Sequence, residues 1–130
     1  MSPEVALFDA CCTDAVGDVA AMADRVRILA GQFRLADVQA GHTGLVRLAG
    51  ELRTLVALLQ AMTALPGVDV ARLTIDGANP DAQIARLGGW LTSLVSAQAE
   101  ADWLTVADTL EYDLEPSLRA LERKLAEGAA

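Results

Sequence analysis

Apolar residues recur at alternating steps of three and four along the first 33 positions of the chain. Their positions are Val5, Phe8, Cys12, Ala15, Val19, Met22, Val26, Leu29 and Phe33. This spacing keeps every member on one face of an α-helix, and it continues through four heptads. Directly before it, Ser2-Pro3-Glu4 combines an N-cap residue, a proline suited to the first helical position and a first-turn acid. The pattern therefore predicts a helix over residues 3–34.

A second seam with the same alternation follows after a short break. Its positions are Val38, Gly41, Leu45, Leu48, Leu52, Leu55, Leu59 and Met62. Asp37 is a plausible N-cap, and Leu65-Pro66-Gly67 ends the pattern, so we expect a helix over 38–64. Because Val56 and Leu58 flank the seam on both sides, this helix should be buried against more than one neighbour.

The longest connection predicted from the pattern covers residues 66–79. Its apolar residues alternate with polar ones, which favours a short extended segment lying across an apolar surface. Near its end, Asp76-Gly77 is a typical turn dipeptide.

Two more helices are expected, over 80–99 and 103–126. Asn79-Pro80-Asp81 repeats the capping logic of the first helix, and Asp102 is the N-cap of the last one. Gly88-Gly89 inside the third helix suggests the close approach of a neighbouring backbone. Pro116 should kink the fourth helix near residues 112–115, because its ring meets the carbonyl four residues earlier. The whole pattern predicts an all-α, four-helix up-and-down bundle that forms one domain over residues 1–130.

Composition and charge narrow the class of protein. Apolar residues make up 53% of the chain but aromatic residues only 4%, so the core must be aliphatic. A formal net charge of −8 argues against nucleic acid as a ligand. The chain contains no run of 18 apolar residues, so we expect no membrane span. The first residues lack the basic region of a secretory signal. With Cys11 and Cys12 adjacent and expected to stay reduced, the chain is predicted to be cytoplasmic.

Acidic residues gather in the fourth helix and form a candidate partner-binding site. Asp108, Glu111 and Glu115 share one helical face, with Tyr112 beside them. We call these four residues the acidic ridge. It could dock a basic partner or hold a hard metal ion. It could also be a solvated face that arginines from a neighbouring helix partly neutralise.

A second candidate surface lies on the first helix. Leu7, Ile28 and Leu35 share one heptad position that is turned away from the seam. Apolar residues outside the seam are a candidate homodimer surface.

No pattern in the chain matches a known catalytic arrangement. The single histidine, His42, lacks the acid three residues earlier that di-iron bundles use. Acidic neighbours of Cys11 would disfavour the reactive thiolate. The chain also lacks phosphate-binding and dinucleotide-binding glycine motifs. We therefore predict no enzyme activity and no cofactor.

Two stretches carry a family resemblance. They are Phe33-Arg34 with Asp37, Gly41, Leu45, Leu48 and Leu52, and Asp102-Trp103 with Ala107-Asp108, Leu110-Glu111-Tyr112, Leu114 and Pro116. Together they resemble a group of small, uncharacterised bacterial helical proteins whose fourth helix carries a Leu-Glu-Tyr-Glu-Leu-x-Pro-type motif. Asp113 stands where that motif has glutamate. In size and helix order the chain is also similar to the flagellin export chaperones. Neither resemblance implies a catalytic activity.

These observations together predict a non-enzymatic bundle that binds another protein as an adaptor or chaperone. One alternative is a structural dimer that associates through Leu7, Ile28 and Leu35. Another is a carboxylate metal-binding protein that uses the acidic ridge.

Overall fold

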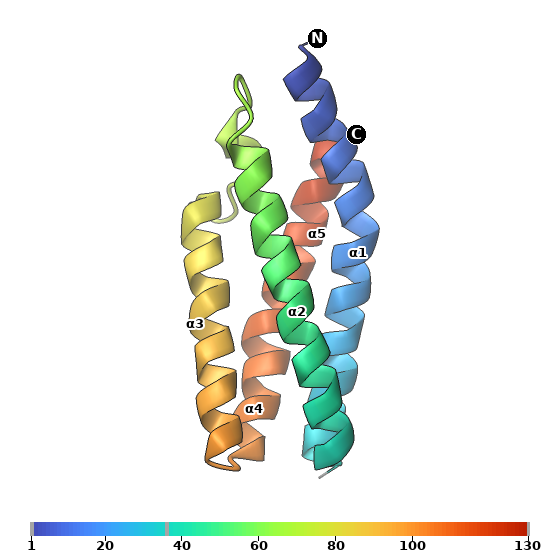
Figure 1. Ribbon diagram of the computed structural model, residues 1–130, viewed down its shortest axis with the longest axis vertical. Helices are drawn as coiled ribbons and strands as arrows, with labels where there is room; N and C mark the ends of the chain where they lie inside the picture. The colour runs from blue at the N-terminus through green and yellow to red at the C-terminus, as the bar shows by residue number, and fades with distance from the viewer. Residues whose placement is uncertain (1, 36, 130) are drawn as a thin grey trace.

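The computed structural model describes residues 2–35 and 37–129 and shows an all-α bundle, which confirms the predicted fold class. Four helical columns run alternately down and up, and the two termini lie at the same end (Figure 1). The columns are α1 (Pro3–Arg34), α2 (Val38–Thr63), α3 (Pro80–Ala99), and a fourth built from α4 (Trp103–Asp108), η2 (Thr109–Leu114) and α5 (Glu115–Ala129). The first three helices match their predicted bounds to within one residue.

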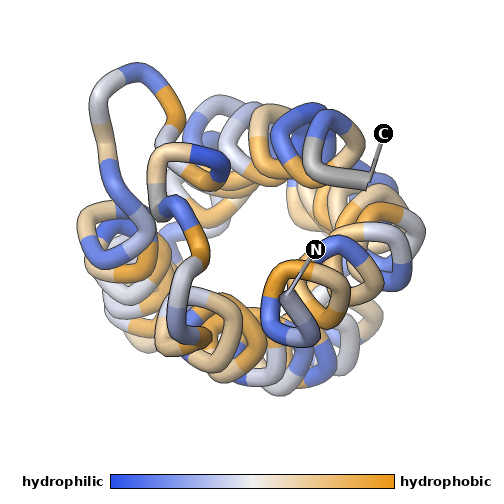
Figure 2. Tube along the Cα trace, turned by 90° about the horizontal axis from the view of Figure 1, so that it is seen from above, coloured by the Kyte–Doolittle hydropathy of each residue, from blue (hydrophilic) through white to orange (hydrophobic). Residues whose placement is uncertain are grey.

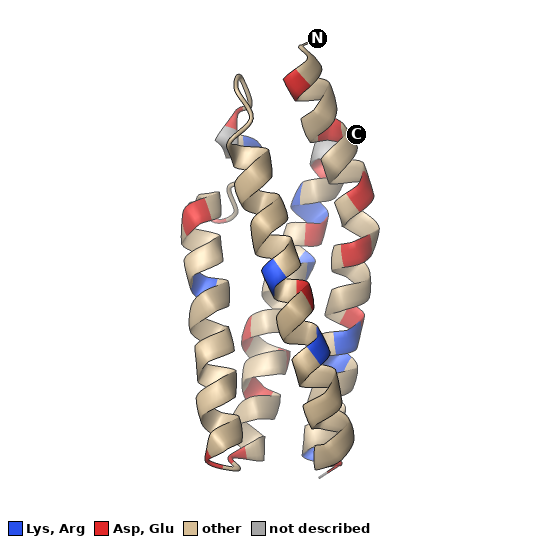
Figure 3. Ribbon diagram, viewed as in Figure 1, with Lys and Arg blue, Asp and Glu red and all other residues tan. Residues whose placement is uncertain are grey.

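The columns follow one another around the bundle in chain order. Viewed along the axis, their apolar positions turn mainly inward (Figure 2). The closest packing is between α1 and α5, whereas α2 and α3 are much more loosely packed. Charged residues are frequent on α1 and α5 and sparse on α3 (Figure 3). The outer surface is therefore uneven in both charge and packing.

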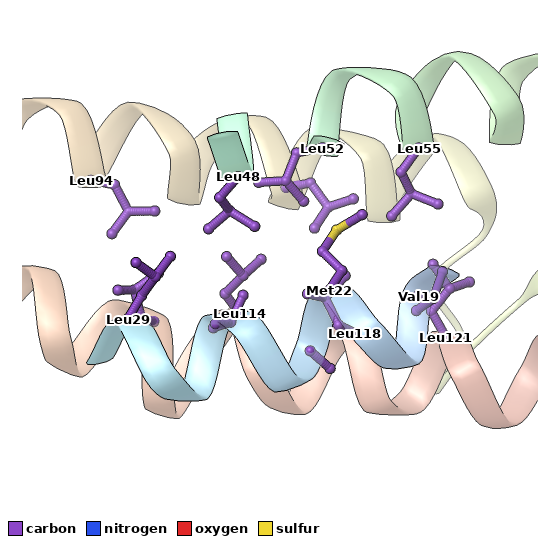
Figure 4. Packing of buried hydrophobic residues seen from close by; sticks show 14 of the residues in the cluster. Val19, Met22, Leu29, Leu48, Leu52, Leu55, Leu94, Leu114, Leu118 and Leu121 are labelled. Atoms are coloured by element: carbon purple, nitrogen blue, oxygen red, sulfur yellow. The ribbon is translucent and has the colours of Figure 1, made fainter. Parts of the chain in front are cut away.

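The core is aliphatic, as the composition requires. Nearly all residues of the two predicted seams are buried, and leucines from α3 and the fourth column complete the cluster. Met22 of α1, Leu52 of α2 and Leu118 of α5 lie near one another in the interior (Figure 4). Each large apolar side chain buried in this way stabilises the fold by about 1.5–3 kcal/mol. The buried side chains of the seams therefore supply most of the driving force for folding.

Side-chain caps start three of the helices, as predicted. The Ser2 hydroxyl accepts a hydrogen bond from the amide of Val5 at 3.2 Å. The Asn79 side chain accepts one from the amide of Ala82 at 2.9 Å. These bonds satisfy backbone donors that have no partner within the helix.

Asp102 and Asp37 differ as helix starts. Asp102 accepts hydrogen bonds from the Thr105 amide at 3.2 Å and from the Thr105 hydroxyl at 2.6 Å. These bonds lower the pKa of Asp102, the hydroxyl bond most strongly. Asp37 is the N-cap residue of α2, as predicted, but its side chain makes no capping hydrogen bond. The backbone amide of Asp37 donates a hydrogen bond to the carbonyl of Gln32, and the carbonyl of Asp37 accepts one from the amide of Gly41.

The connection between α2 and α3 contains a short 3-10 helix, η1 (Val70–Leu73), where an extended segment was predicted. The Asp69 side chain accepts a hydrogen bond from the amide of Ala71 at 3.0 Å and starts this turn. Leu73, at its end, is buried in the core. The predicted turn at Asp76-Gly77 is confirmed, since both residues have positive φ and Ile75 pairs with Ala78 on either side.

Where a kink was predicted before Pro116, the fourth column contains a π-helix, η2. Its closing bond runs from the amide of Glu115 to the carbonyl of Leu110, five residues earlier. Val106, Leu110, Leu114 and Leu118 follow one another at steps of four, and each step would turn an α-helix about 40° away from a common face. All four are nevertheless fully buried. The wider π turn thus keeps the seam facing the core where proline removes a backbone donor.

The glycines expected to meet a neighbouring backbone do not do so. A Cβ added at Gly88 or Gly89 would find no atom within 4 Å, so that prediction was wrong. The close approach occurs on α2, where a Cβ at Gly41 would lie 2.7 Å from Cζ of the Phe33 ring. That ring is buried and stacked on Trp103 at a centroid distance of 5.8 Å, so it has little freedom to move. Gly41 is therefore needed for packing, unlike Gly88 and Gly89.

Two alanine substitutions should change stability in opposite directions. Gly17→Ala is expected to raise the free energy of unfolding by about 0.5–1 kcal/mol, because its Cβ position is open and alanine favours the helix. Gly41→Ala is expected to lower it by about 1–3 kcal/mol through overpacking. Urea unfolding followed by circular dichroism measures both changes. Equal effects of the two substitutions would contradict this account.

The stability contributed by the Asp102 cap should depend on pH. Because folding lowers the pKa of Asp102 below its ordinary 3.8, the carboxylate stabilises the fold above that value and loses its effect as pH falls through the folded-state pKa. Asp102→Asn keeps a neutral cap and removes the charge. We expect wild type to be the more stable by a constant margin above about pH 5, and this margin to shrink below pH 4. A margin that stays unchanged down to pH 2.5 would show that the charge contributes nothing.

Candidate protein-binding site

The acidic ridge is partly neutralised by an arginine from α1. Arg34 lies 2.8 Å from an Asp108 oxygen and 2.5 Å from a Glu111 oxygen. Its guanidinium carbon stands 5.9 Å from the centre of the Tyr112 ring. The hydrogen bonds to Asp108 and Glu111 raise the pKa of Arg34. Three of the four ridge residues thus gather around one cation of the same chain.

The remaining charges of this stretch lack such a partner. Within residues 2–35 and 37–129, Glu115 and Asp113 form no ion pair. Glu115 is half-buried, and Asp113 is exposed. Docking of a basic partner on the ridge stays a prediction, but the structure leaves fewer free carboxylates for it than the sequence suggested.

The predicted dimer stripe is exposed but divided. Leu7, Ile28 and Leu35 expose 52%, 61% and 84% of their surface. Twenty-one residues separate the first two, which is about 32 Å along a helix. Asp14 occupies the same heptad position between them. Only Ile28 and Leu35 are near enough to act together.

A groove runs between α1 and α2 and contains two recesses. The upper recess, toward the chain termini, has a volume of about 390 Å³ and is lined mainly by Ala15, Ala21, Met22, Leu55 and Leu58. The lower recess has a volume of about 450 Å³ and is lined mainly by Ile28, Leu29, Ala40, Gly44 and Leu48. Both share Arg25, Arg47 and Glu51, so they form one continuous surface, which we call the α1–α2 groove.

An ion cluster crosses the middle of the α1–α2 groove. Arg25 donates from Nε to a Glu51 oxygen at 3.0 Å, and a second guanidinium nitrogen contacts the other oxygen. Arg47 approaches the same carboxylate at 3.3 Å. Two cations therefore share one anion, and the Arg47 side chain remains 70% exposed. The cluster carries an excess positive charge that is open to solvent.

The lower recess also holds a polar atom without a partner. The side-chain oxygen of Gln32 is buried and accepts no hydrogen bond from the described residues. Buried acceptors of this kind are rare, because leaving one unpaired costs about 1–3 kcal/mol.

A second groove lies on the other side of α2, against α3. It has a volume of about 290 Å³ and is lined by Leu52, Val56, Ile84, Leu87 and Leu91, with Arg53 at its edge. Val56 lines this groove, and Leu58 lines the α1–α2 groove. These two residues are half-buried and packed against the core, and α2 contacts both α1 and α3, as expected for a helix buried against more than one neighbour.

His42 belongs to a packing cluster at the lower end of the bundle. Its Nδ1 is hydrogen-bonded to the side-chain amide of Gln98, and its ring meets Trp103 edge-on at 5.5 Å. Burial raises the pKa of the Cys12 thiol, which favours the unreactive neutral form. Its contacts account for His42 as a structural residue, and its burial accounts for Cys12 in the same way.

The sequence interpretation missed the residues of the ion cluster. Arg47 and Glu51 are four residues apart, a spacing typical of a helical ion pair, but nothing in the sequence places Arg25 opposite them. Among the residues that the structure describes, no group of three or more His, Cys, Asp and Glu could hold a metal ion. No described helix is both long enough and apolar enough to cross a membrane.

Comparisons with protein-family models, curated proteins and solved structures find no match to this chain. The resemblance to the small bacterial helical proteins and to the export chaperones therefore stays a prediction. Function has to be argued from the surfaces described above.

Removing the cation of the ridge should destabilise the bundle in a salt-dependent way. Arg34→Gln is expected to lower the urea midpoint slightly, because Asp108 and Glu111 then repel each other without a counter-ion. Exposed ion pairs are screened, so the loss should be smaller in 1 M NaCl than in 50 mM NaCl. Arg27→Gln is the matched control, since Arg27 is exposed and unpaired among the described residues. An equal shift in both variants would contradict a specific role for Arg34.

Proposed function

We propose that this protein is a non-enzymatic, cytoplasmic binding protein that captures a helical segment of another protein in the α1–α2 groove. The observation that carries the proposal is that two partly apolar recesses lie along one pair of helices, on either side of the ion cluster. An amphipathic helix laid in such a groove buries its apolar face against residues from both walls. An adaptor or chaperone role is consistent with this mode of binding.

The dimensions of the groove suit a helix. Its lining residues on α1 extend from Ala15 to Gln32, which corresponds to about 25 Å of helix. A segment of about 17 residues would fill that length. The partly exposed Ile28 lies at its edge and would become buried on binding.

A structural homodimer is the second candidate function. The exposed side chains of Ile28, on α1, and Leu35, its C-cap residue, favour it, since seven residues or about two helical turns separate them. The metal-binding alternative has no comparable support, because Arg34 is paired with two of the three ridge carboxylates, Asp108 and Glu111.

Photo-crosslinking in the native host tests the proposal. A benzoylphenylalanine introduced at Thr43, in the lower recess, should form an adduct with a partner protein. The same group at Ser93, which is exposed on α3 and lines none of the described recesses, is the control. We expect the adduct only with the Thr43 variant.

Two results would count against partner capture. An adduct with twice the mass of the chain favours the homodimer. Adducts that form equally from both positions, or no adduct in any growth state, would show that the groove does not capture another protein.

A further inference from the structure

We infer that the groove between α2 and α3, which we call the α2–α3 groove, binds an aliphatic carboxylate. The hydrocarbon chain lies against the apolar walls, and the carboxylate pairs with Arg53. Four features of the groove support this site: its lining, its dimensions, an unpaired cation at its edge and an open glycine in its wall. The site is separate from the α1–α2 groove and does not depend on the proposed function.

The walls of the α2–α3 groove are apolar. Leu52 and Val56 line it from α2, and Ile84, Leu87 and Leu91 line it from α3, which runs beside α2 (Figure 1). Three of these side chains, Val56, Ile84 and Leu91, are only half-buried. A ligand that covers them removes further apolar surface from water, which is the main source of affinity for a hydrocarbon chain.

The groove has the dimensions of such a chain. Its lining extends from Leu52 to Gln60 on α2, which corresponds to about 12 Å of helix. Spread over that length, its volume of about 290 Å³ gives a cross-section of about 24 Å². A helix, which is about 10–12 Å wide with its side chains, is too wide to enter this space. An extended chain of about eight to ten carbons fits it.

The α2–α3 groove has an unpaired positive charge at its edge. Among the described residues that line it, Arg53 is the only charged one. Arg53 is exposed and forms no ion pair within residues 2–35 and 37–129. Its guanidinium group is therefore free to bind both oxygens of an arriving carboxylate.

The wall segments themselves contain no acid. Residues 52–60 and 84–91, from which both walls are built, include two arginines and no Asp or Glu. Glu51 precedes the first segment, but its carboxylate is held in the ion cluster of the α1–α2 groove. Asp81 is in the first turn of α3 and does not line the groove. Because charges farther than about 8–10 Å are largely screened at physiological salt, this local excess of positive charge outweighs the net charge of −8.

Gly88 keeps one wall of the α2–α3 groove open. It lines the groove, yet a Cβ added there would find no atom within 4 Å. Glycine is disfavoured inside a helix, and no packing contact requires it at this position. A larger side chain at position 88 would occupy space that the ligand needs. Substitution of Gly88 can therefore fill the groove without disturbing the fold.

Titration of the full chain with sodium decanoate gives the first test. Amide chemical shifts in NMR spectra locate the bound decanoate, and isothermal titration calorimetry measures its affinity. We expect the shifts to concentrate in residues 52–60 and 84–91. Affinity should fall about fourfold for each methylene removed, as measured with octanoate and hexanoate. Shifts concentrated elsewhere, or no saturable binding below the micelle concentration, would overturn the inference.

Two leucine substitutions give the second test. Gly88→Leu should weaken decanoate binding by at least about tenfold, because its side chain excludes part of the hydrocarbon chain. Gly89→Leu is the matched control, since Gly89 is equally open and lines none of the described recesses. It should change the affinity by less than about twofold. Neither variant should lower the urea midpoint, because leucine favours a helix over glycine. Equal affinities of the two variants would contradict binding in this groove.

A substitution of the cation gives the third test. Arg53→Gln should weaken decanoate binding about threefold to fivefold and reduce its salt dependence, as expected for an exposed charge pair. Arg86→Gln is the control, since Arg86 belongs to the same wall segments but does not line the groove. Decyltrimethylammonium, with an equally long chain and a cationic head, should cause no shifts at the groove. Equal losses in the two variants, or equal binding of the cation, would show that Arg53 does not select a carboxylate.

A second copy of the chain is the competing occupant of the α2–α3 groove. Sedimentation velocity distinguishes it from a small ligand. We expect wild type and Gly88→Leu to have the same oligomeric state. An oligomer that dissociates on Gly88→Leu, together with no binding of decanoate, would make the groove a self-association surface and overturn the inference.

Discussion

The length of α1 is the constraint on which the rest of the bundle depends. Its buried seam runs the full height of the fold and packs against α4, η2 and α5 on one side and α2 on the other. The fourth column must therefore present apolar side chains along its whole length. Its leucines at steps of four, together with a proline, cannot do so in a regular α-helix. The π-helix resolves this conflict at the cost of local regularity.

Tight packing on one side of α1 is accompanied by looser packing around α2. The residues of the α2 seam are buried, but recesses border α2 on both sides. An ion cluster spans the α1–α2 groove where apolar contact would otherwise fill it. Such a groove contributes less to stability than a filled interface, because its side chains retain part of their contact with water. The same property makes it suitable for exchange with a partner.

The helices and most caps could be predicted because burial periodicity and capping are local properties of the chain. Phe8, Leu48 and Leu59 are buried where their spacing places them. The contacts of Arg34 could not be predicted, since its ridge partners lie 74 and 77 residues away. The grooves escaped prediction for a related reason. A pattern shows which face of α2 is apolar, but the distance between neighbouring helices depends on side chains from both.

The π-helix also changes how the fourth column should be compared with other sequences. A π turn accommodates one residue more than an α turn over the same stretch of backbone, so it behaves as a local insertion. The seam before Thr109 and the seam after Leu114 therefore follow two different registers. An alignment that carries one heptad frame through both would misplace every core position on one side. A homologue one residue shorter in this stretch could keep both seams buried with a regular α-helix, and the two chains would still share one fold.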